Sequence, residues 1–180
     1  MKKQLKLITL LILVGGLLVI FSNSTFRMPG NQQNYEPIQP IDFSHRLHAG
    51  EMEVPCQYCH YGASQSRHAG IPATSVCMNC HKYVSATKDD LRLEEEQAMA
   101  EGREMRPLTS LEIIKIYSAM GYDPQGNPVE GKAGKSVEWV KVHNIPDFVF
   151  FSHKPHIAAG VDCTDCHGDV ASMERIKQTE

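Results

Sequence analysis

Aromatic side chains are scarce in this chain: they make up 7% of its 180 residues, and Trp139 is the single tryptophan. A core built from side chains alone therefore lacks bulk, and small chains with thin cores depend on additional stabilising groups. An excess of basic residues is also missing, since the formal net charge is −3 with histidines neutral. That charge argues against a nucleic-acid partner. We therefore expect a non-protein group to fill part of the interior.

Long apolar runs are missing except near the N-terminus. Lys2, Lys3 and Lys6 precede an apolar run over residues 7–21. This run is short for a membrane-spanning helix and long for the core of an average signal peptide. Residues 1–24 thus predict a signal anchor or a cleaved signal peptide, and the weak cleavage site favours the anchor. Since lysines stay inside, we expect the chain on the periplasmic face of the inner membrane.

Composition and motifs divide the rest of the chain into four segments. Residues 25–40 are polar and marked by prolines, which predicts a tether. Residues 41–84 contain two cysteine clusters, and residues 137–180 contain a third. Residues 85–136, between them, predict a helical insert that ends in a turn-rich loop.

Two helices are expected inside the insert. Residues 88–106 are rich in Glu, Ala, Leu, Arg and Met, which predicts an exposed charged helix. Residues 109–121 open with a capping box from Thr109 to Glu112, and Gly121 is placed to end the helix. The predicted apolar face of this second helix consists of Leu111, Ile113, Ile114, Tyr117 and Met120.

All six cysteines belong to three Cys-x-x-Cys-His motifs. On a helical turn, residues i and i+3 share a face, so that two thiols can bond the two vinyl groups of one haem. The histidine at i+4 then reaches the iron. This spacing is typical of c-type haem attachment. We predict covalently bound haem c at three attachment sites: Cys56, Cys59 and His60; Cys77, Cys80 and His81; Cys163, Cys166 and His167.

Three other uses of the cysteines are open. Disulfide bonds are common in exported chains, but they give no reason for a histidine after every second cysteine. Zinc sites use paired cysteines without requiring that histidine each time. A dithiol redox centre needs only one Cys-x-x-Cys pair. The haem interpretation accounts for all three motifs at once.

Two of the motifs follow the same short string. Phe-Ser-His-x-x-His begins at Phe43 before the first motif and at Phe151 before the third. The simplest explanation is that one haem-binding unit occurs twice, separated by the helical insert. Two histidines three positions apart on one short turn could serve two different haems.

Each haem iron needs a second axial ligand. The methionines are better explained as core or helix residues, so histidine ligation on both faces is expected, with low reduction potentials. Six histidines lie outside the motifs although three haems need only three, so some are not ligands or bind haems attached elsewhere. The role of His143 stays open. The candidate distal ligands are His45, His48, His68, His153 and His156.

Several longer strings resemble the pentahaem cytochrome subunit of bacterial alternative complex III, over about residues 41–82 and 137–173. The strings that carry this resemblance include Phe43-Ser44-His45, His68-Ala69-Gly70-Ile71-Pro72, Val76-Cys77-Met78-Asn79-Cys80-His81 and Trp139-Val140-Lys141-Val142-His143-Asn144-Ile145-Pro146. Family members carry five attachment motifs, whereas this chain has three. We therefore expect the chain to be the front part of a longer protein.

The resemblance implies a membrane-bound complex that oxidises quinol and passes electrons to a periplasmic cytochrome or an oxidase. The implied partners are an iron–sulfur protein, integral membrane subunits and a monohaem cytochrome. The chain would attach to the membrane through its N-terminal helix. It would act as an electron-transfer subunit and not as an enzyme by itself.

The alternatives are a free-standing periplasmic trihaem carrier, a haem-based oxyanion reductase with one open iron site, or a structural role in a larger assembly. The expected fold is mostly α-helical and irregular and is organised by haem. It resembles multihaem cytochromes c with motifs like those of cytochromes c3 and c7, preceded by an N-terminal transmembrane or signal helix.

Overall fold

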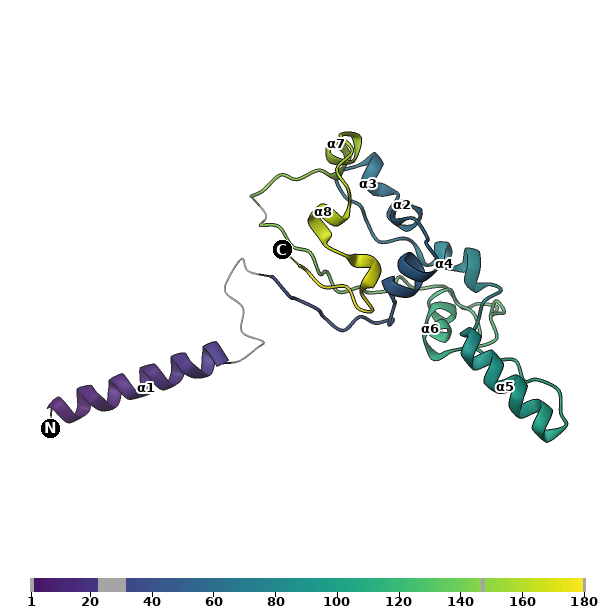
Figure 1. The fold of residues 1–180 in the computed structure, drawn as a ribbon, viewed down its shortest axis with the longest axis horizontal. Helices are drawn as coiled ribbons and strands as arrows, with labels where there is room; N and C mark the ends of the chain where they lie inside the picture. The colour runs from purple at the N-terminus through teal and green to yellow at the C-terminus, as the bar shows by residue number, and fades with distance from the viewer. Residues whose placement is uncertain (1, 23–31, 147, 180) are drawn as a thin grey trace.

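The computed structural model describes residues 2–22, 32–146 and 148–179, with side chains from residue 2 to 18 in the first range. Short helices are joined by long irregular segments (Figure 1). Within the described ranges there is no strand, only one isolated bridge between Tyr122 and Pro128. The expectation of a mostly helical and irregular chain is confirmed.

The N-terminal segment forms the helix α1 (Lys2–Ser22). Its side chains from residue 2 to 18 are all exposed. No helix in the described part of the chain is both long enough and apolar enough to cross a membrane.

The segment expected to be a tether lies partly on residues 23–31, which fall outside the described residues. Its described part runs along the C-terminal half of the chain. The Gln39 side chain donates to the Val140 carbonyl at 2.9 Å and accepts from the Val140 N–H at 2.9 Å. Asn34 N donates to Gln178 O at 2.7 Å. This segment is therefore attached to residues far along the chain.

The haem-motif regions from the two halves of the chain pack against each other. Helix α3 lies beside α7, and η1 lies beside η2 (Figure 1). The backbone of His153 donates to Arg67 O at 3.2 Å, and Arg46 N donates to Met173 O at 2.8 Å. The elements are η1 (Arg46–Glu51, a π-helix), α2 (Cys56–Cys59), α3 (Gly62–Gln65), α4 (Thr74–His81), α7 (His153–Ala158), α8 (Thr164–His167) and η2 (Val170–Ser172).

The first insert helix, α5 (Lys88–Glu101), projects away from the other helices (Figure 1). The prediction that it continues to residue 106 is wrong, because Gly102 adopts a left-handed conformation with φ 64° and ends it. The chain then turns back onto Glu94, which accepts from the Arg103 guanidinium and from Arg106 N at 2.7 Å. These two donors lower the pKa of Glu94 to about 2. The buried carboxylate therefore fixes the reversal of the chain.

The second insert helix is α6 (Leu111–Ala119), shorter than the predicted 109–121. Its N-cap is Ser110, whose side chain accepts from Ile113 N at 3.4 Å, and the expected box from Thr109 does not form. Glu112 accepts instead from Asp42 N at 2.7 Å. The box fails because the helix begins at Leu111 with Ser110 as its N-cap, which places Glu112 at N2 and not at the N3 position that a capping box requires.

The apolar face of α6 also differs from the prediction. Leu111 is 77% exposed, whereas Ile116 is buried together with Ile113 and Tyr117. The hydroxyl of Tyr117 donates to the His81 carbonyl at 2.7 Å. This helix therefore packs directly against the second motif.

The protein core is small, as the scarcity of aromatic residues predicts. Its central cluster contains Ile41 beside the buried face of α6, and Cys77 and Trp139 pack partly against it. Within the described ranges, the buried apolar residues are Ile41, Ala63, Ala86, Ala98, Ile113, Ile116, Tyr117, Val142 and Met173.

Candidate haem-binding site

All three Cys-x-x-Cys-His motifs lie on short helices, as their spacing predicts. The first occupies α2 with His60 as its C-cap, the second ends α4, and the third begins at Cys163, the N-cap of α8. None of the six cysteines, all in the described part of the chain, forms a disulfide. Across the described residues, no three His, Cys, Asp or Glu side chains form a group that could hold a metal ion such as zinc.

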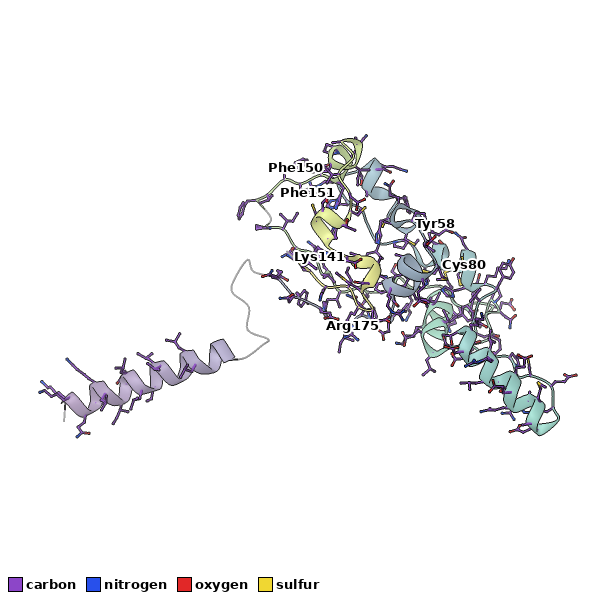
Figure 2. All side chains as sticks on the ribbon, viewed as in Figure 1. Tyr58, Cys80, Lys141, Phe150, Phe151 and Arg175 are labelled. Atoms are coloured by element: carbon purple, nitrogen blue, oxygen red, sulfur yellow. The ribbon has the colours of Figure 1, made fainter. Side chains whose placement is uncertain are left out.

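The cysteines place the first motif between the other two. Burial raises the pKa of the Cys163 thiol, and the neighbouring Cys56 thiol raises it further. Burial likewise raises the pKa of the Cys59 thiol, and the neighbouring Cys80 and Cys56 thiols raise it further. Across this second contact, Asn79 donates to the Tyr58 hydroxyl at 3.0 Å, near Cys80 in Figure 2. The spatial order is therefore third motif, first motif, second motif, which differs from the sequence order.

Several histidines share one hydrogen-bond arrangement. In each, Nδ1 lies against a backbone carbonyl, so the ring is held in one orientation and Nε2 is left for another partner. Histidines that bind metals almost always use their second nitrogen in this way. The pairs are His48 with Ser44 O at 2.8 Å, His60 with Gly70 O at 2.7 Å, His81 with Val84 O at 2.8 Å, His153 with Arg67 O at 2.8 Å and His156 with Ser152 O at 2.8 Å.

Two motif histidines face a second histidine at the separation that one iron requires. Ring centroids are 6.0 Å apart for His48 and His81. For His153 and His167 the distance is 6.4 Å and the rings are nearly parallel, at 7°. Two imidazoles bound to one metal at about 2 Å per nitrogen have centroids about 6 Å apart. The two pairs therefore have the spacing needed to hold one haem iron each.

The third pair consists of His45 and His60. His45 is half-buried, and burial together with the nearby rings of His60 and His48 lowers its pKa to about 4. Its Nδ1 is buried without a hydrogen-bond partner. Burial also lowers the pKa of His48 and of His167. All three are therefore neutral near pH 7, the form in which imidazole binds iron.

The repeated string folds the same way in both copies. Phe43 meets the His45 ring at 4.9 Å and 84°, and Phe151 meets the His153 ring at 4.9 Å and 85°. Phe43 also stacks on His48 at 4.3 Å, as Phe151 lies against His156 at 4.9 Å. One phenylalanine therefore orients both histidines of its turn.

Two of the predicted distal ligands are not brought to a motif histidine. His68 and His156 are exposed, and neither has a ring contact with His60, His81 or His167 in the described part of the chain. His156 is nevertheless oriented like His48, whereas His68 is not. As iron ligands, both stay predictions.

His143, whose role the sequence left open, lies beside the third motif. Its Nε2 is 3.2 Å from Nδ1 of His167. Burial and the neighbouring His167 lower the pKa of His143 to about 4. No local sequence pattern predicts the contact between His143 and His167, because the two residues are 24 positions apart and are brought together by the fold.

Sequence reasoning also missed the backbone groups that orient the ligands. Arg67 and Gly70 supply carbonyls to His153 and His60. Gly62 lies next to this loop, and a Cβ there would meet the Ala69 carbonyl at 2.6 Å. The loop between the first two motifs thus orients His60 of the first motif and His153 of the second repeated turn. Every residue has a backbone carbonyl, so residue type does not reveal which carbonyl orients a histidine. Only the glycines, which permit the close approach of this loop, could have indicated it.

The residues present fit haem c: paired thiols lie on helical turns, and two pairs of histidines face each other with ring centroids 6.0 Å and 6.4 Å apart. Comparisons with known proteins agree with this chemistry. Residues 22–106 match the Class III cytochrome C family. The matches and the motifs together indicate a multihaem c-type cytochrome, a class of protein that transfers electrons through covalently bound haem c.

A curated relative gives a finer likeness. The chain is 29% identical over 147 residues to the multihaem cytochrome c subunit of a menaquinone reductase from Nitratidesulfovibrio vulgaris (strain Hildenborough). The aligned region covers 76% of this chain and 55% of the relative. The chain thus spans about half the length of the curated relative it matches. The resemblance to the subunit of alternative complex III stays a prediction.

Proposed function

We propose that this chain relays electrons as a subunit of a membrane-bound respiratory complex that exchanges electrons with quinone. Haem c, when bound, supplies reversible one-electron exchange between ferric and ferrous iron. The three motifs would hold the cofactors close together, and the backbone carbonyls at Nδ1 would keep the histidines that bind them in one orientation. The observation that carries the proposal is the row of three motifs with paired histidines.

The row is continuous at both of its internal contacts. Cys56 of the first motif interacts with Cys163 of the third, and Cys59 of the first interacts with Cys80 of the second. His60 likewise neighbours His167. The first motif is therefore the central relay, and the second and third motifs form the two ends.

Two histidines would hold each iron in this arrangement, which favours a relay over a catalyst. His81 and His167 each face a distal histidine at about the spacing of a shared iron. His60 has His45 beside it. An oxyanion reductase needs one iron with a free face, so the paired histidines argue against that alternative.

Membership of a quinone-linked complex is supported by the relative, which is named as a subunit of a menaquinone reductase. The resemblance to alternative complex III implies the opposite direction, oxidation of quinol. Both place a multihaem subunit between a quinone site in partner subunits and a second redox partner. We propose that residues 1–24 direct export and that the motifs lie on the periplasmic face of the inner membrane.

Purification of the tagged protein from its native membranes tests the proposal. Integral membrane and iron–sulfur subunits should co-purify, and menaquinol or menaquinone should change the haem α-band in that preparation. A periplasmic protein that elutes alone and does not respond to either quinone species would favour a free-standing carrier. Electrode potentials of the haems and the quinone then give the direction of flow.

Breaking one motif at a time tests the order of the row. Replacing Cys56 and Cys59 with alanine removes the central attachment site, so the two remaining haems should be reduced in separate fast and slow phases. Replacing Cys77 and Cys80 removes an end of the row and should leave the other two haems in rapid exchange. Stopped-flow reduction of both variants measures this difference. Slow phases in the second variant alone would support the sequence order instead.

His156 is a point at which a further haem could extend the row of three motifs. Its ring has the orientation of His48, and its Nδ1 is held by the Ser152 carbonyl at 2.8 Å. We propose that it binds the iron of a haem whose attachment motif lies outside residues 1–180. Loss of one low-spin haem signal from the native complex on His156→Ala substitution would support this role.

A further inference from the structure

The three motif histidines differ in what holds their Nδ1 atoms. His60 and His81 lie against backbone carbonyls, at 2.7 Å and 2.8 Å. The Nδ1 of His167 instead lies 3.2 Å from Nε2 of His143. The two rings are perpendicular, at 89°, with centroids 4.4 Å apart. The third motif is therefore the one whose proximal histidine is held by a side chain.

The direction of this hydrogen bond follows from iron binding. A neutral imidazole that binds iron through Nε2 carries its proton on Nδ1. His167 faces His153 across a gap that fits one iron, so its Nδ1 donates and His143 Nε2 accepts. His143 then has no lone pair left on Nε2 for an iron of its own.

The surroundings hold His143 in place. The preceding residue, Val142, is buried and 7% exposed. The Lys141 ammonium donates to the Asn144 side chain at 3.0 Å, which bridges the position of His143. Lys141 lies in the segment before α7 (Figure 2). A hydrogen-bonding group tunes its partner only when its own position is fixed.

We propose that His143 is a positioning residue that holds the proximal ligand of the third motif and sets the reduction potential of that haem apart from the other two. This inference deepens the proposed function and rests on it. An acceptor at Nδ1 makes the ligating imidazole more basic, which stabilises ferric iron and lowers the potential. Without that acceptor, the potential of one haem should rise.

The test uses the haem-loaded protein in a redox titration followed by optical and electron paramagnetic resonance spectra. His143→Phe keeps a ring but removes the acceptor. We expect a positive shift of one midpoint potential by about 59 mV, a tenfold change in the ferric-to-ferrous ratio for one electron. His143→Gln places an amide oxygen near the former Nε2 and should restore most of the original potential. Ile145→Val is the matched control on the same segment, because the Ile145 side chain is 41% exposed, and it should leave all potentials unchanged.

Haem content and spin state separate the possible outcomes. Three covalent haems, three low-spin bis-histidine signals and one shifted potential support the proposal. Loss of one low-spin signal would show that His143 is an iron ligand, and unchanged potentials would show that its contact has no effect; either result overturns the proposal. If His143→Phe loads no haem at the third motif, His143→Asn, whose amide is too short to reach His167, provides the same comparison. Failure of the proposed relay would look different, because quinone would not change the spectrum even in the unaltered protein.

Discussion

The two Phe-Ser-His-x-x-His turns have the same internal geometry and different surroundings. In the first turn His48 is half-buried and faces His81, with ring centroids 6.0 Å apart. In the second turn His156 is exposed, although Ser152 O orients it as Ser44 O orients His48. The local sequence thus orients two histidines in each turn. The segments that pack beside the turn decide which of these histidines faces a motif histidine.

The packing around each turn explains this difference. The first turn, continued by η1, is covered by η2, and Arg46 pairs with Glu174 at 2.5 Å. The second turn, continued by α7, contacts only α3 closely among the described elements. One side of α7 therefore stays open next to His156. Because His156 is exposed and oriented, it could bind a further haem at this side of α7 and so extend the row.

Removing all haem should have the largest effect on stability. It should also abolish the difference in surroundings between the two turns, because that difference depends on the folded protein. With all six cysteines replaced by alanine, we expect the protein to be largely unfolded, since cofactor ligation contributes folding free energy to a chain with a small core. Far-ultraviolet circular dichroism measures this loss. A native-like spectrum from the haem-free variant would contradict the prediction. Replacement of Cys163 and Cys166 alone is the control and should remove one haem of three.

Replacing the last histidine of each turn should separate the two copies most directly. His48→Ala removes an axial ligand, so one low-spin haem should become high-spin or change its ligand. His156→Ala should leave the three haems of residues 1–180 unchanged, because no motif histidine among the described residues faces it. Electron paramagnetic resonance of both variants, made in residues 1–180 loaded with haem and separated from other haem-bearing chains, makes the comparison. Equal losses in the two variants would show that His156 serves one of these three haems.

A methyl group tests the packing around the first turn. A Cβ at Gly50 would lie 2.4 Å from the Ala171 carbonyl in η2, so Gly50→Ala should destabilise the protein by about 1–3 kcal/mol. The second copy already has an alanine at the corresponding position, Ala158, which is exposed. Chemical denaturation of the haem-loaded protein measures the change. Ala158→Ser serves as the control, and we expect a change within about 0.5 kcal/mol.

The serine of each turn should show the smallest difference. Ser44 Oγ accepts from Leu47 N at 3.0 Å, whereas the Ser152 side chain makes no cap bond to α7. Ser44→Ala should therefore cost about 0.5–1.5 kcal/mol, and Ser152→Ala should be close to neutral. Both are measured by the same denaturation experiment. A larger loss from Ser152→Ala would mean that the second turn is packed more tightly than its exposure suggests.

The sequence predicted well what depends on neighbouring residues. The helical turns that carry the three Cys-x-x-Cys-His motifs follow from spacing alone. The prediction of two similar turns is also supported, since Phe43 and Phe151 orient their histidines alike. Local order is enough here because each motif spans little more than one helical turn.

What the sequence did not predict depends on contacts between distant residues. The facing of His48 and His81, the contact of His143 with His167 and the exposure of Leu111 all depend on which segments pack together. The end of α5 at Gly102 is similar, because the chain reverses there onto Glu94. Composition favoured a helix that continues to residue 106. The chain instead reverses after Gly102, and Arg103 pairs with the buried Glu94.

The out-of-sequence row has a consequence for biosynthesis and for evolution. Cys56 and Cys163 meet across a long loop that contains the whole insert, so this contact can form only late in synthesis and contributes to a high contact order. Loop-closure entropy grows slowly, by about 0.6 kcal/mol for each doubling of loop length. The insert could therefore lengthen or shorten at little thermodynamic cost to that junction. The contact between Cys56 and Cys163 should therefore form slowly during folding. The length of the insert between them could nevertheless change in evolution with little effect on stability.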